Sequence, residues 1–401
     1  MKYNILIKYI NSFPSVADGE SISSNRLSLL CDLLGRVNVG EGYIHILGGA
    51  YAHASAVALE AMLCEAGYSV CRISDVHGFD IKQCVYVNRE IPGIDDYTDV
   101  LTHIRGILKK NSDVPFLREE IAFAFSLYVS KIMGCKYVIL ENTTDVGDTL
   151  SAICPKYNYA IIPKIYGSVT EEGLDMRCKA IDRVTRGVVT GNNSLYRYFS
   201  DRCQRAGIRL SIHRAFDIVS ESNRSRIINY GGKEYKLKSS SDMLCDAIIS
   251  AIELVEIMKI QGAKIPPAKM VDGINSMQCG GFFEIISSSP LIVADVSCAE
   301  AEIAQTIEKL TSMPDKGGEY KLAVCGENDE LVGKVKLCAG SDVDVCKIDW
   351  DADGVCEQKK YSHIAKKMIE MGKGASAILL LGSCEFICNV KSAFVLMMNK
   401  L

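Results

Sequence analysis

Residues 43–74, YIHILGGAYAHASAVALEAMLCEAGYSVCRIS, decide the fold. They read as a short apolar run, a glycine turn at Gly48 and Gly49, a long helix ending at Gly67, and a second β-rich run. Strand, glycine turn, helix and strand in this order are typical of the βαβ unit of a parallel sheet. A phosphate group is expected at the first strand-to-helix turn, because a helix N-terminus offers free N–H groups.

The alternation of strands and helices continues along the chain. Before the βαβ unit, Ser24 is expected to cap a helix that stops at Gly35. After it, the pattern predicts a helix at 116–135, strands at 136–141, 159–165, 186–191 and 208–213, a helix at 195–206, a hairpin edge at 230–240, a helix at 242–262, and a loop holding Pro266 and Pro267.

The pattern restarts near residue 285, with strands expected at 290–295, 320–325, 342–350 and 376–383 and a helix at 300–310. We therefore predict two doubly wound α/β domains, residues 1–284 and 285–401. Ligands are expected at the carboxyl ends of the strands.

The composition is that of an ordinary soluble globular chain. Of 401 residues, 48% are hydrophobic, and the formal net charge is -4, which gives no basic field for nucleic acid or an acidic membrane. We find neither a signal peptide nor an apolar run of about 18 residues, so no membrane span is expected. The 17 cysteines are scattered singly without a C-x-x-C pair, which favours reduced thiols packed in the core of a cytoplasmic protein.

The stretch from Tyr43 to Asn88 resembles folylpolyglutamate synthases and dihydrofolate synthases of the Mur ligase superfamily. In that family a strand I-H-V is followed by the loop G-T-N-G-K-G-S, and Ile44, His45 and Gly48 match. The resemblance runs across nearly the whole chain. It implies a P-loop-type central domain with a mainly parallel sheet and a smaller C-terminal Rossmann-like domain. It also implies an ancestral ATP-dependent ligase of one-carbon metabolism that adds glutamate to a folate-type carboxylate.

The ATP loop departs from the family at its charged and metal-binding positions. Gly49 replaces the threonine, Tyr51 a glycine, Ala52 the phosphate-binding lysine, His53 the next glycine and Ala54 the serine. Losing such a lysine typically costs on the order of 10²–10³ in rate. His53 is either a substitute cation or a partly exposed loop histidine. The candidate nucleotide-binding residues are Gly48, Gly49, Tyr51, His53 and Ser55.

Glu141 matches the glutamate that helps to hold Mg²⁺ in the family. The segment after it, residues 142–149, lacks the glycines and the arginine that the family carries there. Glu141 is therefore a candidate metal ligand, alone or with Asp145 and Asp148. The alternative is a solvated cluster of loop carboxylates, because Mg²⁺ usually relies on substrate phosphates as well.

Three further residues are catalytic candidates through the same resemblance. His77 falls on the histidine of an S-P-H-L motif and is otherwise a loop histidine. Arg183 stands where the family has a lysine that is carbamylated to bridge metal, which arginine cannot replace. Asp295 matches the first residue of the family's D-G-A-H-N hinge, and it either contacts a ligand or caps a helix.

Matches to the family gather in apolar strands and structural glycines, and mismatches gather in the ATP and metal site. The sequence thus predicts a divergent folylpolyglutamate synthase-like protein whose ATP chemistry is weakened or lost. For such a protein the sequence names no cofactor, and the expected partner is a small acidic or pterin-like ligand or a protein, such as an active ligase. The alternative is an active ATP-dependent carboxylate–amine ligase that uses ATP and Mg²⁺ through substitute residues.

Overall fold

The computed structural model describes most of the chain in two compact units. Unit 1 comprises Met1–Asp217, Ile228–Lys236 and Cys245–Met277, and unit 2 comprises Ile218–Ile227, Leu237–Leu244 and Gln278–Leu401. The described residues are 2–16, 19–48, 50–74, 81–142, 149–164, 171–191, 195–222, 225–238, 241–288, 291–297, 300–312, 322–326, 329–339, 343–347, 363, 366–368, 370, 376–383, 386–387, 390–391 and 394.

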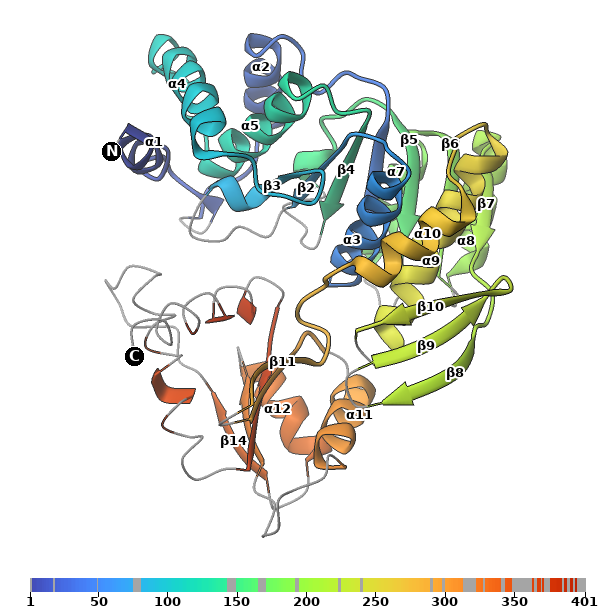
Figure 1. Cartoon of the computed structure of the whole chain (residues 1–401). Coiled ribbons are helices and arrows are strands. Elements are labelled where there is room, and N and C mark those ends of the chain that lie inside the picture. Colours follow the sequence, from blue (N-terminus) through green and yellow to red (C-terminus); the bar gives the residue numbers. More distant parts are fainter. Residues whose placement is uncertain are drawn as a thin grey trace. The chain divides into compact units, whose positions relative to one another are not determined.

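Unit 1 is built on a seven-stranded sheet with the order β3-β2-β4-β1-β5-β6-β7 (Figure 1). Every neighbouring pair is parallel except β2 and β3. The predicted mainly parallel α/β sheet is therefore confirmed. The strands are β1 (Tyr43–Leu47), β2 (Val70–Ser74), β3 (Val85–Val87), β4 (Tyr137–Asn142), β5 (Tyr157–Ile162), β6 (Val184–Thr190) and β7 (Arg209–Ile212).

All five residues of β1 and of β2 are buried, because helices cover both faces of this sheet. One face packs in a single core with six helices: α1 (Lys2–Ile10), α2 (Ser24–Leu33), α4 (Ile94–Lys110), α5 (Arg118–Ile132), α7 (Glu171–Ile181) and α8 (Tyr196–Ala206). The other face is covered by α3 (Ala50–Glu65), with α9 (Asp242–Ile260) and α10 (Pro267–Ser276) beside it. A short 3₁₀ turn, η2 (Ile81–Cys84), precedes β3.

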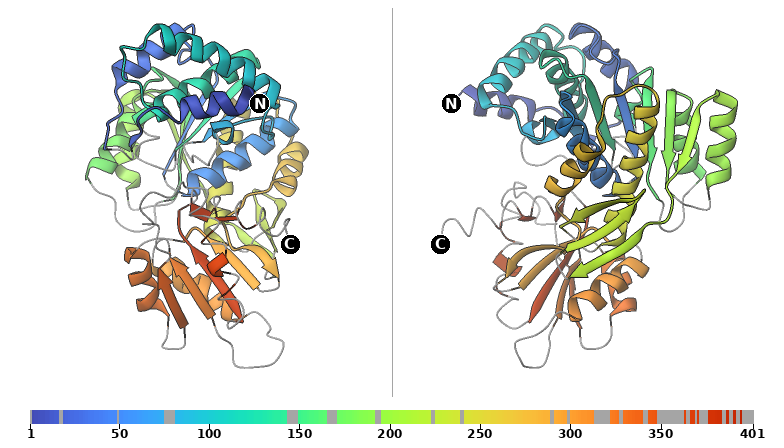
Figure 2. Two further views of the ribbon diagram at one scale, coloured as in Figure 1. Left: turned by 90° about the vertical axis from the view of Figure 1, so that its left-hand side faces the viewer. Right: turned by 45° about the vertical axis from the view of Figure 1, so that its right-hand side comes forward.

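A three-stranded sheet of order β10-β9-β8 follows in sequence, and Figure 2 shows it from a second direction. Unit 2 carries a five-stranded sheet of order β11-β12-β15-β13-β14, in which β11 runs antiparallel to β12. These elements are β8 (Asp217–Ser222), β9 (Ser225–Tyr230), β10 (Lys233–Leu237), β11 (Glu284–Ser288), β12 (Leu291–Asp295), α11 (Glu300–Thr311), β13 (Leu322–Gly326), α12 (Asp329–Cys338), β14 (Val343–Lys347) and β15 (Ala377–Leu381).

Two local predictions are wrong. The N-cap of α2 is Ser23, whose side chain accepts a hydrogen bond from the Arg26 N–H at 3.4 Å, so Ser24 is already helical. Pro266 lies in the loop as predicted, but Pro267 is already the first residue of α10, where proline lacks only an N–H that a helix leaves unused. Residues 218–227 and 237–244 belong to unit 2, and the boundary at 284/285 stays a prediction.

A substitution at Gly273 tests the close packing of α10 on α3. A Cβ there would lie 2.8 Å from the Met62 Cα, a backbone atom that cannot move aside cheaply. Gly273→Ala should therefore cost about 1–3 kcal/mol of unfolding free energy. Gly106→Ala in α4 is the matched control, because a Cβ there meets nothing within 4 Å. It should stabilise by about 0.5–1 kcal/mol. Urea denaturation measures both, and effects of the same sign would contradict the packing argument.

Candidate functional site

The turn that should hold phosphate is shorter than predicted. Helix α3 begins at Ala50, so Tyr51 and His53 lie on its first turn and not in a loop. Gly48 follows β1 and has φ 118°. The next residue, Gly49, lies outside the described residues. The predicted loop from residue 48 to residue 55 is therefore mostly helix.

Ser55, a predicted nucleotide-binding residue, has a partner inside the protein. Its side chain is fully buried and its Oγ donates to the Ala247 carbonyl of α9 at 2.9 Å. Ala52 and Ala54, at the family's lysine and serine positions, are also fully buried. All three residues thus take part in the packing of α3.

Glu141 lies at the carboxyl end of β4, next to β1 and β2, where parallel sheets place their ligands. It is 1% exposed, so it is not a solvated loop carboxylate. Its Oε1 lies 2.7 Å from His53 Nδ1 and accepts a hydrogen bond from Ser74 Oγ at 3.0 Å. This carboxylate therefore contacts side chains from the first turn of α3 and from the end of β2.

The second oxygen of Glu141 is held by a buried arginine in the middle of β2. Arg72 Nη1 donates to Glu141 Oε2 at 2.7 Å, and Arg72 Nε donates to Glu60 Oε2 at the same distance. The remaining oxygen, Glu60 Oε1, accepts the Arg89 N–H at 2.9 Å. Each of the four carboxylate oxygens in this cluster thus already has a donor or an imidazole partner.

These contacts set the charge state of the site. Burial by itself would raise the pKa of Glu141, but the His53 imidazolium and the Arg72 guanidinium outweigh it and lower the pKa to about 2. The cluster holds the carboxylates of Glu60 and Glu141 and the guanidinium of Arg72. When His53 is protonated it adds a second positive charge, and the net charge of the four side chains is then zero. A divalent cation at Glu141 would have to displace these partners. Among the described residues, no group of three or more His, Cys, Asp and Glu side chains is arranged to hold a metal.

Comparison with known proteins gives matches among solved structures alone. No protein-family model and no curated protein matches the chain. The apo form of Lactobacillus casei folylpolyglutamate synthase matches with TM-score 0.77 and 15% identity, covering 99% of this chain and 100% of that chain. A folylpolyglutamate synthase complex with AMPPCP and folate matches with TM-score 0.78 and 15% identity over the same shares. This chain has the folylpolyglutamate synthase fold.

The same likeness extends to a second organism. The Mycobacterium tuberculosis folylpolyglutamate synthase complexed with ADP and AMPPCP matches with TM-score 0.71 and 13% identity, and 98% of each chain is covered. The predicted Mur-ligase-like fold is therefore confirmed along the full length of the folylpolyglutamate synthase structures. At this identity the likeness concerns the fold, and the chemistry has to be argued from the side chains.

Arg183 does not lie beside Glu141. Arg183 precedes β6, and its carbonyl accepts the N–H of Tyr157, the first residue of β5. It therefore lies at the amino ends of these strands, whereas Glu141 lies at the carboxyl end of β4. His77, like Asp145 and Asp148, lies outside the described residues.

Asp295 ends β12 in unit 2 and has a structural set of partners. One oxygen accepts the Ser297 N–H at 2.8 Å and the Ser297 hydroxyl, and the other accepts the Phe283 N–H at 2.7 Å. Burial raises the pKa of Asp295 to about 6, although these hydrogen bonds act to lower it. The carboxylate thus fixes the turn after β12.

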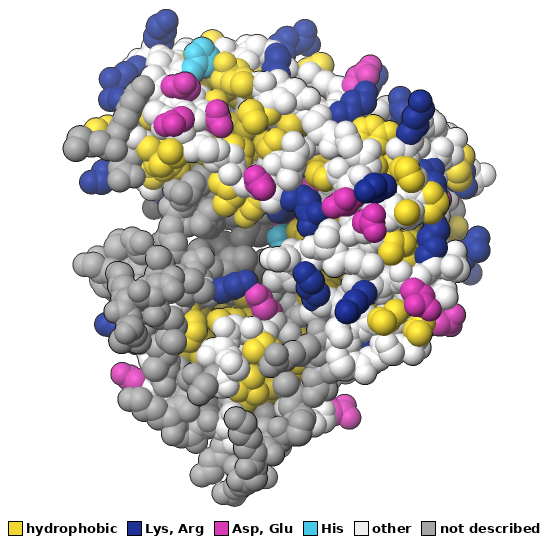
Figure 3. All heavy atoms as spheres, viewed as in Figure 1, with side chains coloured by type: hydrophobic (Ala, Val, Ile, Leu, Met, Phe, Trp, Pro, Cys, Tyr) yellow, Lys and Arg dark blue, Asp and Glu magenta, His cyan; other side chains and the backbone are white. Residues whose placement is uncertain are grey.

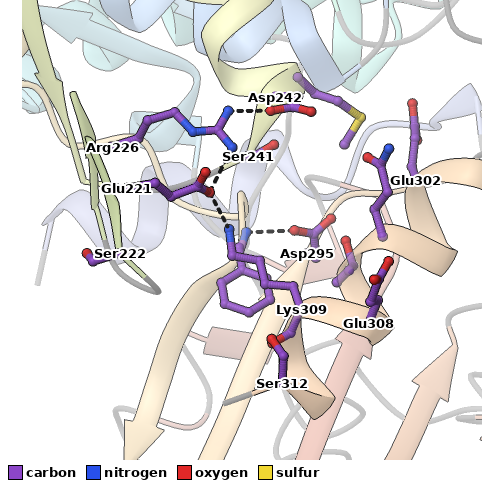
Figure 4. A pocket seen from close by; sticks show the side chains of 14 residues that line it. Glu221, Ser222, Arg226, Ser241, Asp242, Asp295, Glu302, Glu308, Lys309 and Ser312 are labelled. Atoms are coloured by element: carbon purple, nitrogen blue, oxygen red, sulfur yellow. Dashed lines mark hydrogen bonds and ion pairs between the residues drawn. The ribbon is translucent and has the colours of Figure 1, made fainter. Parts of the chain in front are cut away.

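A cavity of about 540 Å³ opens beside Asp295 within unit 2 (Figure 4). Lys309 extends across it, with Nζ 3.8 Å from Glu221 and 4.7 Å from the Phe283 ring centroid. Burial lowers the pKa of Lys309, and Glu221 acts in the opposite direction. Arg226 pairs with Glu221 at 2.8 Å and with Asp242. The charged lining residues are Glu221, Arg226, Asp242, Asp295, Glu302, Glu308 and Lys309.

Arg72 and Glu60 are the site residues that sequence reasoning missed. Arg72 interrupts an apolar strand and Glu60 an apolar helix, and both are buried in the folylpolyglutamate synthase fold. A charge inside a predicted buried element needs a partner, because an unpaired buried charge is very costly. That signal was available, since the pattern placed both residues in core elements.

Proposed function

We propose that this protein is a non-catalytic folylpolyglutamate synthase-like protein that keeps the ligase fold and has lost the Mg-ATP chemistry. The observation that carries the proposal is that His53 and Arg72 already contact the two carboxylate oxygens of Glu141. A ligase of this type needs an open carboxylate for the metal and a cation for the phosphates. In this chain the metal-type carboxylate is neutralised from inside the protein.

The residues in the first turn of α3 support the same conclusion, because they lack the groups that would bind phosphate. Ala52 and Ala54 offer no charge or hydroxyl and are buried. His53 is the nearest cation on this turn, and its Nδ1 contacts Glu141. The cation therefore compensates a carboxylate of the fold, and a triphosphate would have to compete with Glu141 for it.

One feature favours the alternative of an active ligase. Glu141 is still placed at the carboxyl edge of the sheet, one strand from the turn at Gly48. An active site would require His53 to swing away and Mg²⁺ to take its place at Oε1. The energetic objection is that Mg²⁺ must then be held largely by one carboxylate that Arg72 still occupies.

The cavity in unit 2 bears on the kind of ligand that the protein could take. Its lining has five acidic side chains and two basic ones. Like charges repel an acidic ligand there. Among the functions left open by the sequence, this cavity favours partner binding over the binding of a small acidic ligand.

Calorimetric titration with Mg-ATP tests the loss of nucleotide chemistry. We expect no saturable heat at up to about 1 mM, which corresponds to a binding free energy weaker than about 4 kcal/mol. Glutamate-dependent release of ADP should also be absent with folate or dihydropteroate. An active folylpolyglutamate synthase in the same buffer is the positive control. Micromolar Mg-ATP affinity, or turnover that Glu141→Ala abolishes, would overturn the proposal.

A further inference from the structure

An apolar groove with an acidic rim lies between α4 and α5 in unit 1. Its volume is about 350 Å³, and Val100, Tyr128, Ile132 and Met133 supply much of its lining. Ile132 is 54% exposed and Met133 43%, so two neighbouring large apolar side chains add to the exposed apolar surface of the groove. Further exposed aliphatic side chains, Ile91 and Ile94, lie at the start of α4.

Acidic side chains border this groove. Asp96 and Asp99 both line it and both are exposed, and Asp95 adds a third carboxylate to the first turn of α4. In Figure 3 acidic and hydrophobic side chains gather over this end of the molecule. The groove therefore suits an apolar or aromatic anchor that is accompanied by basic residues.

Helix α8 of the same chain carries such a combination. Tyr198 is 58% exposed, the most exposed aromatic side chain among the described large hydrophobics. Arg202 follows Tyr198 by four residues and Arg205 by seven, so the three share one face of the helix. Arg202 pairs with Asp182, whereas Arg205 is exposed. Tyrosine and arginine are the residue types that most often dominate binding energy at interfaces.

The two surfaces cannot meet within one chain. Helix α5 packs on β2 and β3 at one end of the seven-stranded sheet, and α8 packs on β7 at the other end. Figure 1 shows α4 and α8 on opposite sides of unit 1. Any contact between them must therefore join two molecules.

We propose that the α4/α5 groove of one molecule binds α8 of a second copy of this chain, with Tyr198 in the groove and Arg205 against Asp96 and Asp99. The contact is heterologous, because different surfaces meet, so each bound pair leaves one surface of each kind free and the assembly grows head to tail. The inference is independent of the proposed loss of Mg-ATP chemistry, since neither surface includes Glu141 or its partners.

Sedimentation equilibrium of the full chain measures this association. The weight-average mass should rise above 44.0 kDa with concentration and pass the value of a dimer. Raising the salt from about 0.05 M to about 0.5 M should weaken the association, because exposed charge pairs are screened. Ile132→Arg in the groove and Tyr198→Asp on α8 each place a like charge against the partner surface. Each should weaken self-association by at least about tenfold.

Mixing the two variants gives the sharpest test. The Tyr198→Asp protein keeps a good groove and the Ile132→Arg protein keeps a good α8, so the mixture should form one-to-one pairs that cannot grow further. Recovery of pairing also shows that both variants are folded. Leu337→Asp on exposed α12 is the matched control and should leave self-association unchanged.

Four results would overturn the inference. The first is a wild-type protein that stays monomeric up to about 200 µM, well above the micromolar affinity of a small specific interface. The second is wild-type association that survives both variants. The third is a mixture that remains monomeric although circular dichroism shows both variants folded. A monomeric wild type that instead takes an unrelated basic amphipathic peptide into the groove would also reject a second copy as the occupant.

Discussion

Replacing Arg72 with methionine is expected to lower the free energy of unfolding by about 3–5 kcal/mol. The side chain is 6% exposed and bridges Glu60 and Glu141, whose side chains are 2% and 0% exposed. Methionine has a similar length and no charge. Two buried carboxylates would then face each other with His53 as the remaining cation of the cluster, and an uncompensated buried charge is far more costly than a missing contact.

Urea denaturation at pH 7 measures the effect of Arg72→Met. Arg202→Met is the matched control, because Arg202 and Asp182 form an exposed pair at 2.5 Å. Exposed pairs contribute about 0–1 kcal/mol, so the control should change stability little. The contrast between the two variants isolates the consequence of burial.

If the loss of stability comes from uncompensated buried charge, a second result is expected for the same cluster. Adding Glu60→Gln and Glu141→Gln to Arg72→Met removes the uncompensated charges, so the triple variant should recover most of the lost stability. A loss below about 1 kcal/mol for Arg72→Met would contradict the account. A triple variant less stable than Arg72→Met would do so as well.

Acid should destabilise the fold through His45 before most carboxylates titrate. His45 lies in central strand β1 and is 2% exposed. Its Nε2 accepts from Asn142 Nδ2 at 2.7 Å, an orientation assigned because Asn142 Oδ1 accepts from Ser151 Oγ at 2.9 Å. The ring stacks on Tyr157 with centroids 4.7 Å apart. Burial and then the charge of Arg183 lower the pKa of His45 to about 3.

The sign of the effect follows from the protons bound. The folded state keeps His45 neutral down to about pH 3, whereas the unfolded chain protonates it near pH 6.5. Its contribution to stability is therefore complete above pH 6.5 and is lost as the pH falls towards 3. The slope in this window is about 1.4 kcal/mol per pH unit, so a drop from pH 6.5 to pH 5 costs about 2 kcal/mol.

Unfolding free energies of the wild type and of His45→Gln between pH 5 and pH 7.5 test this account. Glutamine does not titrate, so the difference between the two slopes reports His45 alone. The variant should be less stable at pH 7.5 and should depend less steeply on pH. In the native wild type the imidazole carbon resonances of His45 should stay unchanged down to pH 5. Parallel pH profiles, or a native resonance that titrates near pH 6, would reject a neutral buried His45.

The sequence indicated many of the helices and strands and their order along the chain. The run YIHILGG followed by an alanine-rich helix and then SVCRIS indicated β1, α3 and β2 before any contact was known. Apolar periodicity is a local property of the chain, and it also separated the two α/β sheets. The resemblance carried by Ile44, His45 and Gly48 indicated the folylpolyglutamate synthase fold, which solved structures with 13–16% identity match.

The sequence located Glu141 but not its state. Tertiary structure decided that His53 faces this carboxylate, that Ser55 serves packing against α9, and that Arg183 lies at the opposite edge of the strands from Glu141. His53 and Glu141 are 88 residues apart, and Arg72 and Glu141 are 69 apart. The strength of such a pair depends on distance, direction and burial, which are set when α3, β2 and β4 pack together. A local pattern fixes which residues carry charge, whereas only the packed sheet fixes which charges cancel.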